Sequence, residues 1–334
     1  MQSELVIRLK STLGFCVTGQ APSDAPHQVR ERYGIVFGIV AAVIWGGYLA
    51  VSRHGISVGL TAADLAFLRY TTAGVLLLPW LLRNGPISLG GIGWLKGGML
   101  AILAGPLFVL VGASGFLFAP LAHSAVIQLG TLTLMGIVLS AIIIGERPGA
   151  RRILGIAVIV IGLSATAGPA MLGGGSTAWK GDLLFACAGT MWALFTVLQR
   201  RWQITPIAAT AVVSVLSALF YAPAYLWRFG FAKLLSAGPA VLAQQVMVLG
   251  LLSGVVALFA FARAVEYLGP GRASFFPAAA PAIAILLGIP ISGEIPDIWQ
   301  IGGLILLSAG LLLALQGSGD ARCRCGKHSV DLYR

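Results

Sequence analysis

The chain has 334 residues, of which 58% are hydrophobic and only 10% are charged. Soluble globular domains carry about 25% charged residues, so this composition excludes an ordinary soluble fold. The net charge of +11 would suggest nucleic acid as a partner, but the basic residues lie in short gaps between apolar runs and form no basic stripe with interleaved aromatics. We therefore expect a lipid bilayer, and no nucleic acid, around this chain.

Residues 1–33 precede the first long apolar run and hold only a short apolar stretch at 13–17. That stretch is too short for a secretory signal peptide. We interpret residues 1–33 as an N-terminal tail. The sequence leaves open an interfacial amphipathic segment, a disordered tail, or a start codon upstream of the native one.

Ten apolar runs follow, and each is long enough to span a membrane, because about 20 residues at 1.5 Å each cross a hydrocarbon core of about 30 Å. The uncharged stretch at 97–145 is too long for one span, and Pro120 supplies a turn inside it. The sequence thus predicts an all-α membrane protein of about ten transmembrane helices. We expect them at residues 34–52, 61–82, 97–118, 124–145, 153–171, 182–199, 206–227, 241–262, 273–292 and 298–316.

Ten spans place both termini on one side of the membrane, and the basic residues between spans indicate which side. With the termini in the cytoplasm, nine basic residues of the gaps lie inside and four lie outside. The inside set is Arg83, Lys96, Arg147, Arg151, Arg152, Arg200, Arg201, Arg263 and Arg272, and the outside set is Arg53, Lys180, Arg228 and Lys233. This asymmetry predicts that both termini are cytoplasmic.

The chain repeats itself. Gly34 precedes Trp45 by the same eleven residues that separate Gly181 from Trp192, and a basic residue follows each tryptophan by eight, namely Arg53 and Arg200. Each half holds five predicted helices, an odd number, so the second half enters the membrane upside down relative to the first. We assign residues 34–172 to the first repeat, 173–317 to the second and 318–334 to a cytoplasmic C-terminal tail.

A second repeated motif closes the fourth helix of each half. Gly145 and Glu146 are followed by a proline and two glycines, and Gly293 and Glu294 are followed by the same residue types at identical spacings. An acid at a membrane surface costs little, so we predict that both glutamates tie a short turn to neighbouring backbone or basic groups. The repeated prolines and glycines are Pro148, Gly155, Gly162, Pro296, Gly303 and Gly310.

These motifs resemble the EamA-type carriers of the drug/metabolite transporter superfamily. The resemblance covers residues 34–317, and it implies a ten-helix carrier with a central cavity between its halves, in the inner membrane of a bacterium. Thr133 stands where the family pattern has an intramembrane proline in the first half. The residues that carry the resemblance are Trp45, Gly46, Leu68, Arg69, Tyr70, Pro79, Gly145, Glu146, Trp192, Pro281, Gly293 and Glu294.

Arg69 is the charge that the spans place near the middle of the membrane, roughly 12 Å into its helix. A charge there costs about 2.5 to 3.5 kcal/mol and needs a cavity or a partner. One interpretation makes Arg69 the counter-charge for a carboxylate or phosphate of a substrate. The other pairs its guanidinium with helix carbonyls or with Asp64, one and a half turns away.

Aromatic residues deep in the opening helices are candidates for lining the cavity. Trp45, Tyr48 and Trp192 offer flat apolar walls with one hydrogen-bond donor each, and simple helix packing is the alternative. Pro281, together with Pro277, is expected to interrupt the backbone hydrogen bonds of the ninth helix, which frees carbonyls that either kink the helix or face the substrate.

The coupling ion cannot be assigned from the sequence. No acid lies near the middle of a predicted helix, so Glu266 and His123 are the candidate titrating groups, and a histidine near a surface turn is usually only solvated. We leave open proton coupling, transport without coupling, and a homodimer. Cysteine spacing predicts neither a disulfide nor a metal site, and we interpret Cys323, Cys325 and His328 as part of the basic tail, with no cofactor.

The function favoured by these observations is a secondary transporter, an exporter of small metabolites such as amino acids, that works by alternating access. A channel or uncoupled facilitator is the nearest alternative, and a membrane scaffold that transports nothing is a remote one. An intramembrane serine protease is also remote, because Ser114 has only His123, beyond the turn, as a nearby base. We therefore expect no enzyme.

Overall fold

The computed structural model describes residues 27–146, 148–172, 177–273 and 275–328, and every regular element within them is a helix. Residues 1–26, Cys16 included, lie outside the described part, as do the side chains of Cys323, Cys325 and His328. Helix α16 continues to His328, so the predicted C-terminal tail begins as helix. The elements are α2 (His27–Ser57), α3 (Ala62–Arg83), α4 (Trp94–Ala104), α5 (Pro106–Gly115), α6 (Leu121–His123), η1 (Ser124–Gln128), α7 (Leu129–Leu139), η2 (Ser140–Ile144), α8 (Ala150–Leu172), α9 (Ala178–Arg201), α10 (Pro206–Phe229), α11 (Ala232–Ser236), α12 (Pro239–Gln245), η3 (Val246–Val256), α13 (Ala257–Leu268), α14 (Pro270–Ala273), α15 (Phe275–Ser292) and α16 (Ile298–His328).

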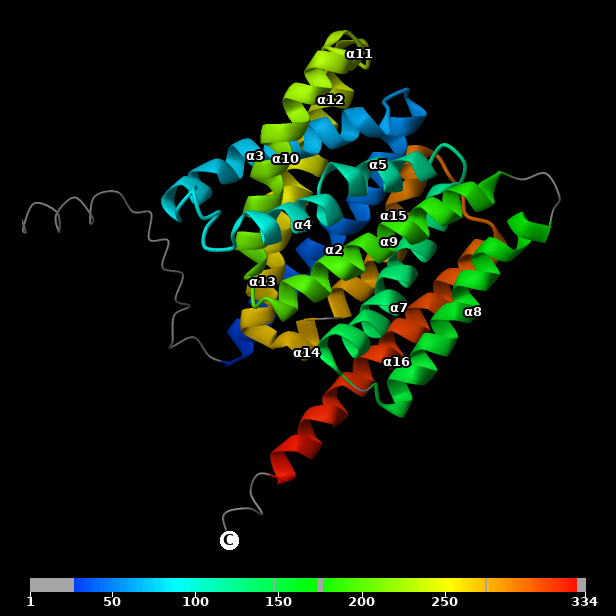
Figure 1. Cartoon of the computed structure of the whole chain (residues 1–334). Helices are drawn as coiled ribbons and strands as arrows, with labels where there is room; N and C mark the ends of the chain where they lie inside the picture. Colours follow the sequence, from blue (N-terminus) through cyan, green and yellow to red (C-terminus); the bar gives the residue numbers. More distant parts are fainter. Residues whose placement is uncertain (1–26, 147, 173–176, 274, 329–334) are drawn as a thin grey trace, which may run out of the picture.

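Helices of the described residues form a bundle whose members are long and apolar enough to cross a membrane. Nine segments meet both conditions in the described part of the chain. Helix α8, with 23 residues, lies alongside α16 as a further membrane-length helix (Figure 1). The prediction of an all-α membrane protein with about ten spanning helices is confirmed.

The two halves are interleaved. The opening helix of the first half, α2, packs against α13 and α15 of the second half, and the opening helix of the second half, α9, packs against α5 and α7 of the first. Helices α3 and α10 pair with each other, as do α8 and α16. Equivalent helices of the two halves therefore make equivalent contacts, as two inverted five-helix repeats require.

Repeated glycines let the last helices of the two halves touch backbone to backbone. A Cβ atom added at Gly155 would lie 2.8 Å from the Gly310 carbonyl oxygen, and one added at Gly162 would lie 3.0 Å from the Gly303 carbonyl oxygen. Small residues at such crossings permit the close approach on which helix association in lipid depends. The spacing of these glycines in the sequence is thus explained by the α8–α16 contact.

We expect Gly162→Leu to destabilise the protein by about 1–3 kcal/mol, the usual cost of overpacking, because a leucine side chain cannot fit between α8 and α16. Gly302→Leu is the matched control, since a Cβ atom at Gly302 meets nothing within 4 Å. Thermal unfolding of the detergent-solubilised variants measures the difference. Equal melting temperatures for the two variants would contradict the contact.

Helix α15 runs without a gap through Pro281 and Pro290, so the prolines do not divide it, and the kink expected at Pro281 stays a prediction. A break instead divides the third helix at Gly105, which has an extended backbone. Pro106 explains this position, because proline disfavours a helical conformation in the residue before it and fits the first turn of the next helix. At Pro281, packing within the bundle holds the helix together despite one missing backbone donor.

Candidate functional site

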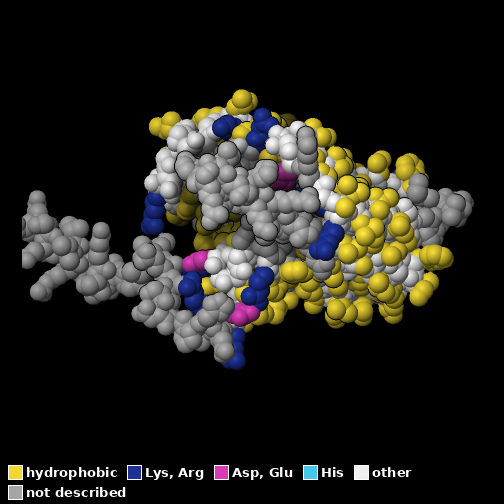
Figure 2. Space-filling view, turned by 90° about the horizontal axis from the view of Figure 1, so that it is seen from below, with side chains coloured by type: hydrophobic (Ala, Val, Ile, Leu, Met, Phe, Trp, Pro, Cys, Tyr) yellow, Lys and Arg dark blue, Asp and Glu magenta, His cyan; other side chains and the backbone are white. Residues whose placement is uncertain are grey.

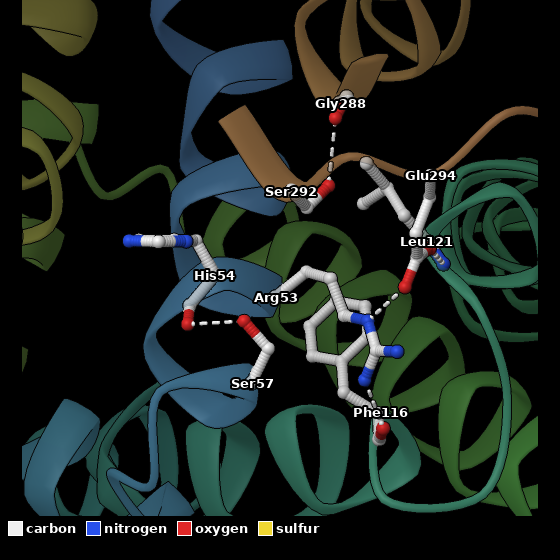
Figure 3. Close-up of polar contacts among 8 residues, drawn as sticks. All are labelled: Arg53, His54, Ser57, Phe116, Leu121, Gly288, Ser292 and Glu294. Atoms are coloured by element: carbon white, nitrogen blue, oxygen red, sulfur yellow. Dashed lines mark hydrogen bonds and ion pairs between the residues drawn. The ribbon is translucent and has the colours of Figure 1, made fainter. Parts of the chain in front are cut away.

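An ion pair between the two halves closes the end of the bundle at which α15 turns into α16. Arg53 of α2 donates from Nε to the carboxylate of Glu294 and from Nη1 to the carbonyl oxygen of Phe116 at 2.5 Å (Figure 3). The backbone N–H of Leu121 donates to the second Glu294 oxygen at 2.7 Å. This N–H begins helix α6 and has no partner inside that helix. We call Arg53, Phe116, Leu121 and Glu294 the Glu294 seam.

A corresponding contact lies where η2 turns into α8. Arg200 of α9 donates to the carboxylate of Glu146, and a guanidinium nitrogen of Arg152 lies 3.6 Å from the other Glu146 oxygen. Arg201 donates to the backbone carbonyl of Ile143. We call Ile143, Glu146, Arg152, Arg200 and Arg201 the Glu146 seam.

The repeat relates the two seams. In each, the arginine that follows the deep tryptophan of one half meets the Gly-Glu turn of the other half. Gly145 and Gly293 have φ values of 85° and 70°, a left-handed conformation in which glycine closes a helix and directs the next residue back toward the bundle. The turns at Glu146 and Glu294 lie at opposite ends of the bundle (Figure 1). Two equivalent contacts between the halves therefore exist, one at each end.

Exposure distinguishes the two ion pairs. The side chains of Arg53 and Glu294 are 22% and 24% exposed, whereas Arg200 is 56% and Glu146 29% exposed. Screening by solvent weakens exposed pairs, so the Glu294 seam is the stronger contact.

Arg69 is buried inside the bundle against two aromatic rings. Its guanidinium carbon lies 4.6 Å from the centre of the Tyr48 ring and 5.5 Å from that of Tyr70. Tyr48 belongs to α2, and Arg69 and Tyr70 to α3, so the cation lies between two helices of the first half. Two of the predicted site residues, Arg69 and Tyr48, are thus in direct contact.

The interpretation that pairs Arg69 with Asp64 is wrong. Asp64 accepts hydrogen bonds from the backbone N–H and hydroxyl of Thr61, at 2.7 and 2.8 Å, and from the hydroxyl of Tyr225. Its carboxylate therefore binds the N-terminal cap of α3 and a side chain of α10. Among the described side chains, none with a carboxylate forms an ion pair with Arg69.

The two deep tryptophans pack on aromatic rings of the opposite half. The Trp45 ring lies 5.3 Å from that of Phe261, and the Trp192 ring lies 4.9 Å from that of Phe108. Phe195, on the same helix as Trp192, has its ring 5.2 Å from that of Trp192. Each tryptophan thus occupies the same place in its repeat.

A cavity of about 260 Å³ adjoins the Glu294 seam. Its walls come from the α6 turn, α15, the segment between α15 and α16 and the start of α16, and they include Leu121, Ile285, Glu294, Asp297 and Gln300. None of the predicted substrate residues lines it, and Pro281 is buried within α15. The structure therefore does not bring Arg69, Trp45, Tyr48, Trp192 and Pro281 together around this cavity.

His123 is not the solvated surface histidine that the sequence suggested. It is buried, and its Nδ1 atom lies 2.7 Å from Oδ1 of Asp182, which is buried as well. The sequence pattern did not indicate Asp182, because the sixth span was predicted to begin there, whereas α9 begins at Ala178 and carries Asp182 one turn into the bundle. Glu266, the other candidate titrating group, is exposed and pairs with Arg263 at 2.9 Å.

No hydrogen bond joins Ser114 to His123, although the structure describes both residues. A serine nucleophile needs a base within hydrogen-bond reach. The geometry therefore adds no support for the protease interpretation.

Basic side chains gather on the face from which α16 projects, and apolar side chains cover the adjoining flank (Figure 2). This is the end of the bundle that holds the Glu146 seam. The flank matches a surface that lipid covers, and the basic face matches the sequence count of arginine and lysine on one side.

Comparison with known proteins agrees with the repeat. A family model described as the EamA-like transporter family matches residues 32–167 and again residues 179–316. A solved structure titled "Crystal structure of protein" is similar with a TM-score of 0.52 and 20% identity, over 84% of this chain and 95% of that one. At this identity the likeness concerns the fold alone. The search of curated proteins found no match.

Proposed function

We propose, since the chain belongs to the EamA-like transporter family, that it exports small anionic or zwitterionic metabolites, such as amino acids, across the inner membrane by alternating access. Membership of a transporter family argues against an enzyme. The substrate class rests on Arg69, and the mechanism rests on the two seams.

The single observation that carries the substrate class is the buried guanidinium of Arg69. Burying a cation in the bilayer region is costly, and although each of the two cation–π contacts contributes about 0.5–2 kcal/mol, neither tyrosine ring carries an opposite charge. No carboxylate of the described residues neutralises it. A substrate carboxylate is the group that would complete the pairing, as in charge-assisted hydrogen bonds of arginine.

The two seams support alternating access over a permanently open pore. In the orientation that places both termini in the cytoplasm, the Glu294 seam faces outward and the Glu146 seam faces the cytoplasm. Each seam joins one half to the other, so rocking of the halves can open one while the other stays closed. A channel would need both open at once.

Counterflow in proteoliposomes tests the transport proposal. Purified protein is loaded inside with unlabelled compound and offered labelled compound outside, with amino acids, a purine, a sugar phosphate and a cationic drug as the panel. We expect saturable counterflow for an anionic or zwitterionic member. Flux that does not saturate would indicate a channel, and counterflow of the cationic drug alone would contradict the substrate class.

Growth tests address the direction. Cells that express the protein should survive higher concentrations of a toxic amino-acid analogue if the protein exports it, because export lowers the internal concentration. Increased sensitivity would indicate import and overturn the proposed direction.

A further inference from the structure

His123 and Asp182 form a buried contact between the two halves beside the Glu294 seam. The side chains are 6% and 11% exposed, and their nearest atoms are 2.7 Å apart. His123 follows Leu121 by two residues, and Leu121 is bound by Glu294. The short helix α6 of the first half is thus held at both ends by carboxylates of the second half.

One oxygen of this pair is left without a partner. Oδ2 of Asp182 is buried and makes no hydrogen bond in the described structure. A carboxylate buried with a single hydrogen bond is costly as an anion, and a neighbouring imidazolium would neutralise its charge. A proton added to the imidazole would therefore cancel the charge of this buried pair.

Histidine is the side chain that ordinarily changes charge between pH 5 and 8. A π-helical segment, η1 (Ser124–Gln128), begins immediately after His123. Such segments are common at functional sites, because they re-aim side chains inside a helix.

The pair has no counterpart in the Glu146 seam. The spacing between Glu146 and Glu294 makes Gly271 the equivalent of His123, and the spacing between Trp45 and Trp192 makes Ile35 the equivalent of Asp182. Neither carries a titratable side chain. The repeat thus gives both ends an arginine–glutamate contact, but it gives only one end a group that responds to pH.

We propose that His123 and Asp182 form a proton-binding site that holds the outer seam closed. This inference rests on the proposed function, which supplies the opening of the seam and its outward orientation. When the pair takes up a proton from outside, the imidazole becomes an imidazolium, and attraction between opposite charges adds to the hydrogen bond that already joins His123 to the Asp182 carboxylate. Because the proton binds the closed state better, external acid shifts the population toward closure.

Other charged groups on the surrounding helices do not replace this pair. Arg53 and Glu294 bind each other. Lys180 lies over the rings of Phe118 and Trp179. On the remaining neighbours, Asp297 accepts the backbone N–H of Gln300, and the ring of His54 points away from the seam (Figure 3).

Labelling of a cysteine in the cavity beside the seam tests the proposal without any substrate. Ile285 lines the cavity and is only 7% exposed, so we expect Ile285→Cys to react with a membrane-impermeant maleimide faster when the seam opens. Ser57→Cys, at an exposed position, corrects for the pH dependence of the thiol reaction. Both are made after Cys16, Cys187, Cys323 and Cys325 have been replaced by serine. We expect the rate ratio of Ile285→Cys to Ser57→Cys to fall about fivefold from external pH 8 to 5.5, because a second charge on the hydrogen-bonded pair contributes on the order of 1 kcal/mol.

Two variants remove the titrating pair and keep its shape. His123→Gln and Asp182→Asn should each make the ratio independent of pH, whereas His54→Gln should retain the fivefold change. If His123→Gln fails to fold, Asp182→Asn provides the same measurement. A wild-type ratio that does not change with pH, or a His123→Gln or Asp182→Asn protein that keeps the wild-type change, would overturn the proposal.

The experiment separates this inference from the proposed function. Labelling is also measured in inverted vesicles, with the pH varied on the exposed side. If the cavity cysteine reacts only there and still responds to pH through His123, the proton site stands and the proposed orientation fails. A protein that transports none of the panel compounds yet shows the fivefold change would likewise leave the site intact.

Discussion

Arg69→Ala is expected to reduce transport of an anionic or zwitterionic substrate by about 100-fold, while the protein remains folded. Removing one partner of a buried charge contact costs about 2–5 kcal/mol, and each 1.4 kcal/mol corresponds to a factor of ten. Arg69 is buried and has no carboxylate partner among the described residues, so its loss removes little from the protein itself. Initial rates of counterflow measure the effect.

The pattern across three variants separates binding from general damage. Arg69→Lys keeps the charge but not the planar group that lies over Tyr48, so we expect activity between that of wild type and Arg69→Ala. Arg83→Ala removes an exposed arginine from the last turn of the same helix and should leave transport unchanged. Uptake by Arg69→Ala at the wild-type rate would refute the role of Arg69 as the counter-charge.

The burial of Arg69 followed from its depth in an apolar run, because that argument needs only helix geometry and the thickness of a bilayer. The same argument could not choose its neighbours. Asp64 lies close in sequence, yet its carboxylate is taken by Thr61, three residues earlier, in a local helix cap. Tyr48, which contacts the guanidinium, belongs to another helix. Local capping competes with any longer contact, and only the packing of helices settles the outcome.

The pair of His123 and Asp182 shows the limit of sequence reasoning more sharply. The two residues are 59 positions apart and belong to different halves. Each looked like a surface residue, because charge was used to mark the ends of the spans. That rule fails where a polar pair buries its charge by mutual contact. The break at Gly105 was missed for a different reason, since a glycine followed by proline inside a long apolar run is compatible with either a break or a kink.

Opposite shifts in the same labelling experiment are the expected result for Glu294→Gln and Glu146→Gln. Glu294→Gln weakens the outer seam, so Ile285→Cys should react faster from outside. A partly buried charged hydrogen bond contributes about 1.5–3 kcal/mol, which corresponds to roughly 10- to 100-fold in the open population. Glu146→Gln weakens the inner seam and favours the inward-open state, so the same cysteine should react more slowly from outside.

The two effects should differ in size as well as in sign, because the repeat equates the residues but not their surroundings. Arg200 is more than half exposed, and an exposed pair contributes at most about 1 kcal/mol, so Glu146→Gln should slow labelling by about fivefold or less. Charge reversal checks that the ion pair is responsible: Glu294→Arg should open the outer seam further, and adding Arg53→Glu should restore closure. Shifts of the same sign for the two glutamine variants would mean that opening one seam does not close the other. Rocking of the inverted halves would then be excluded.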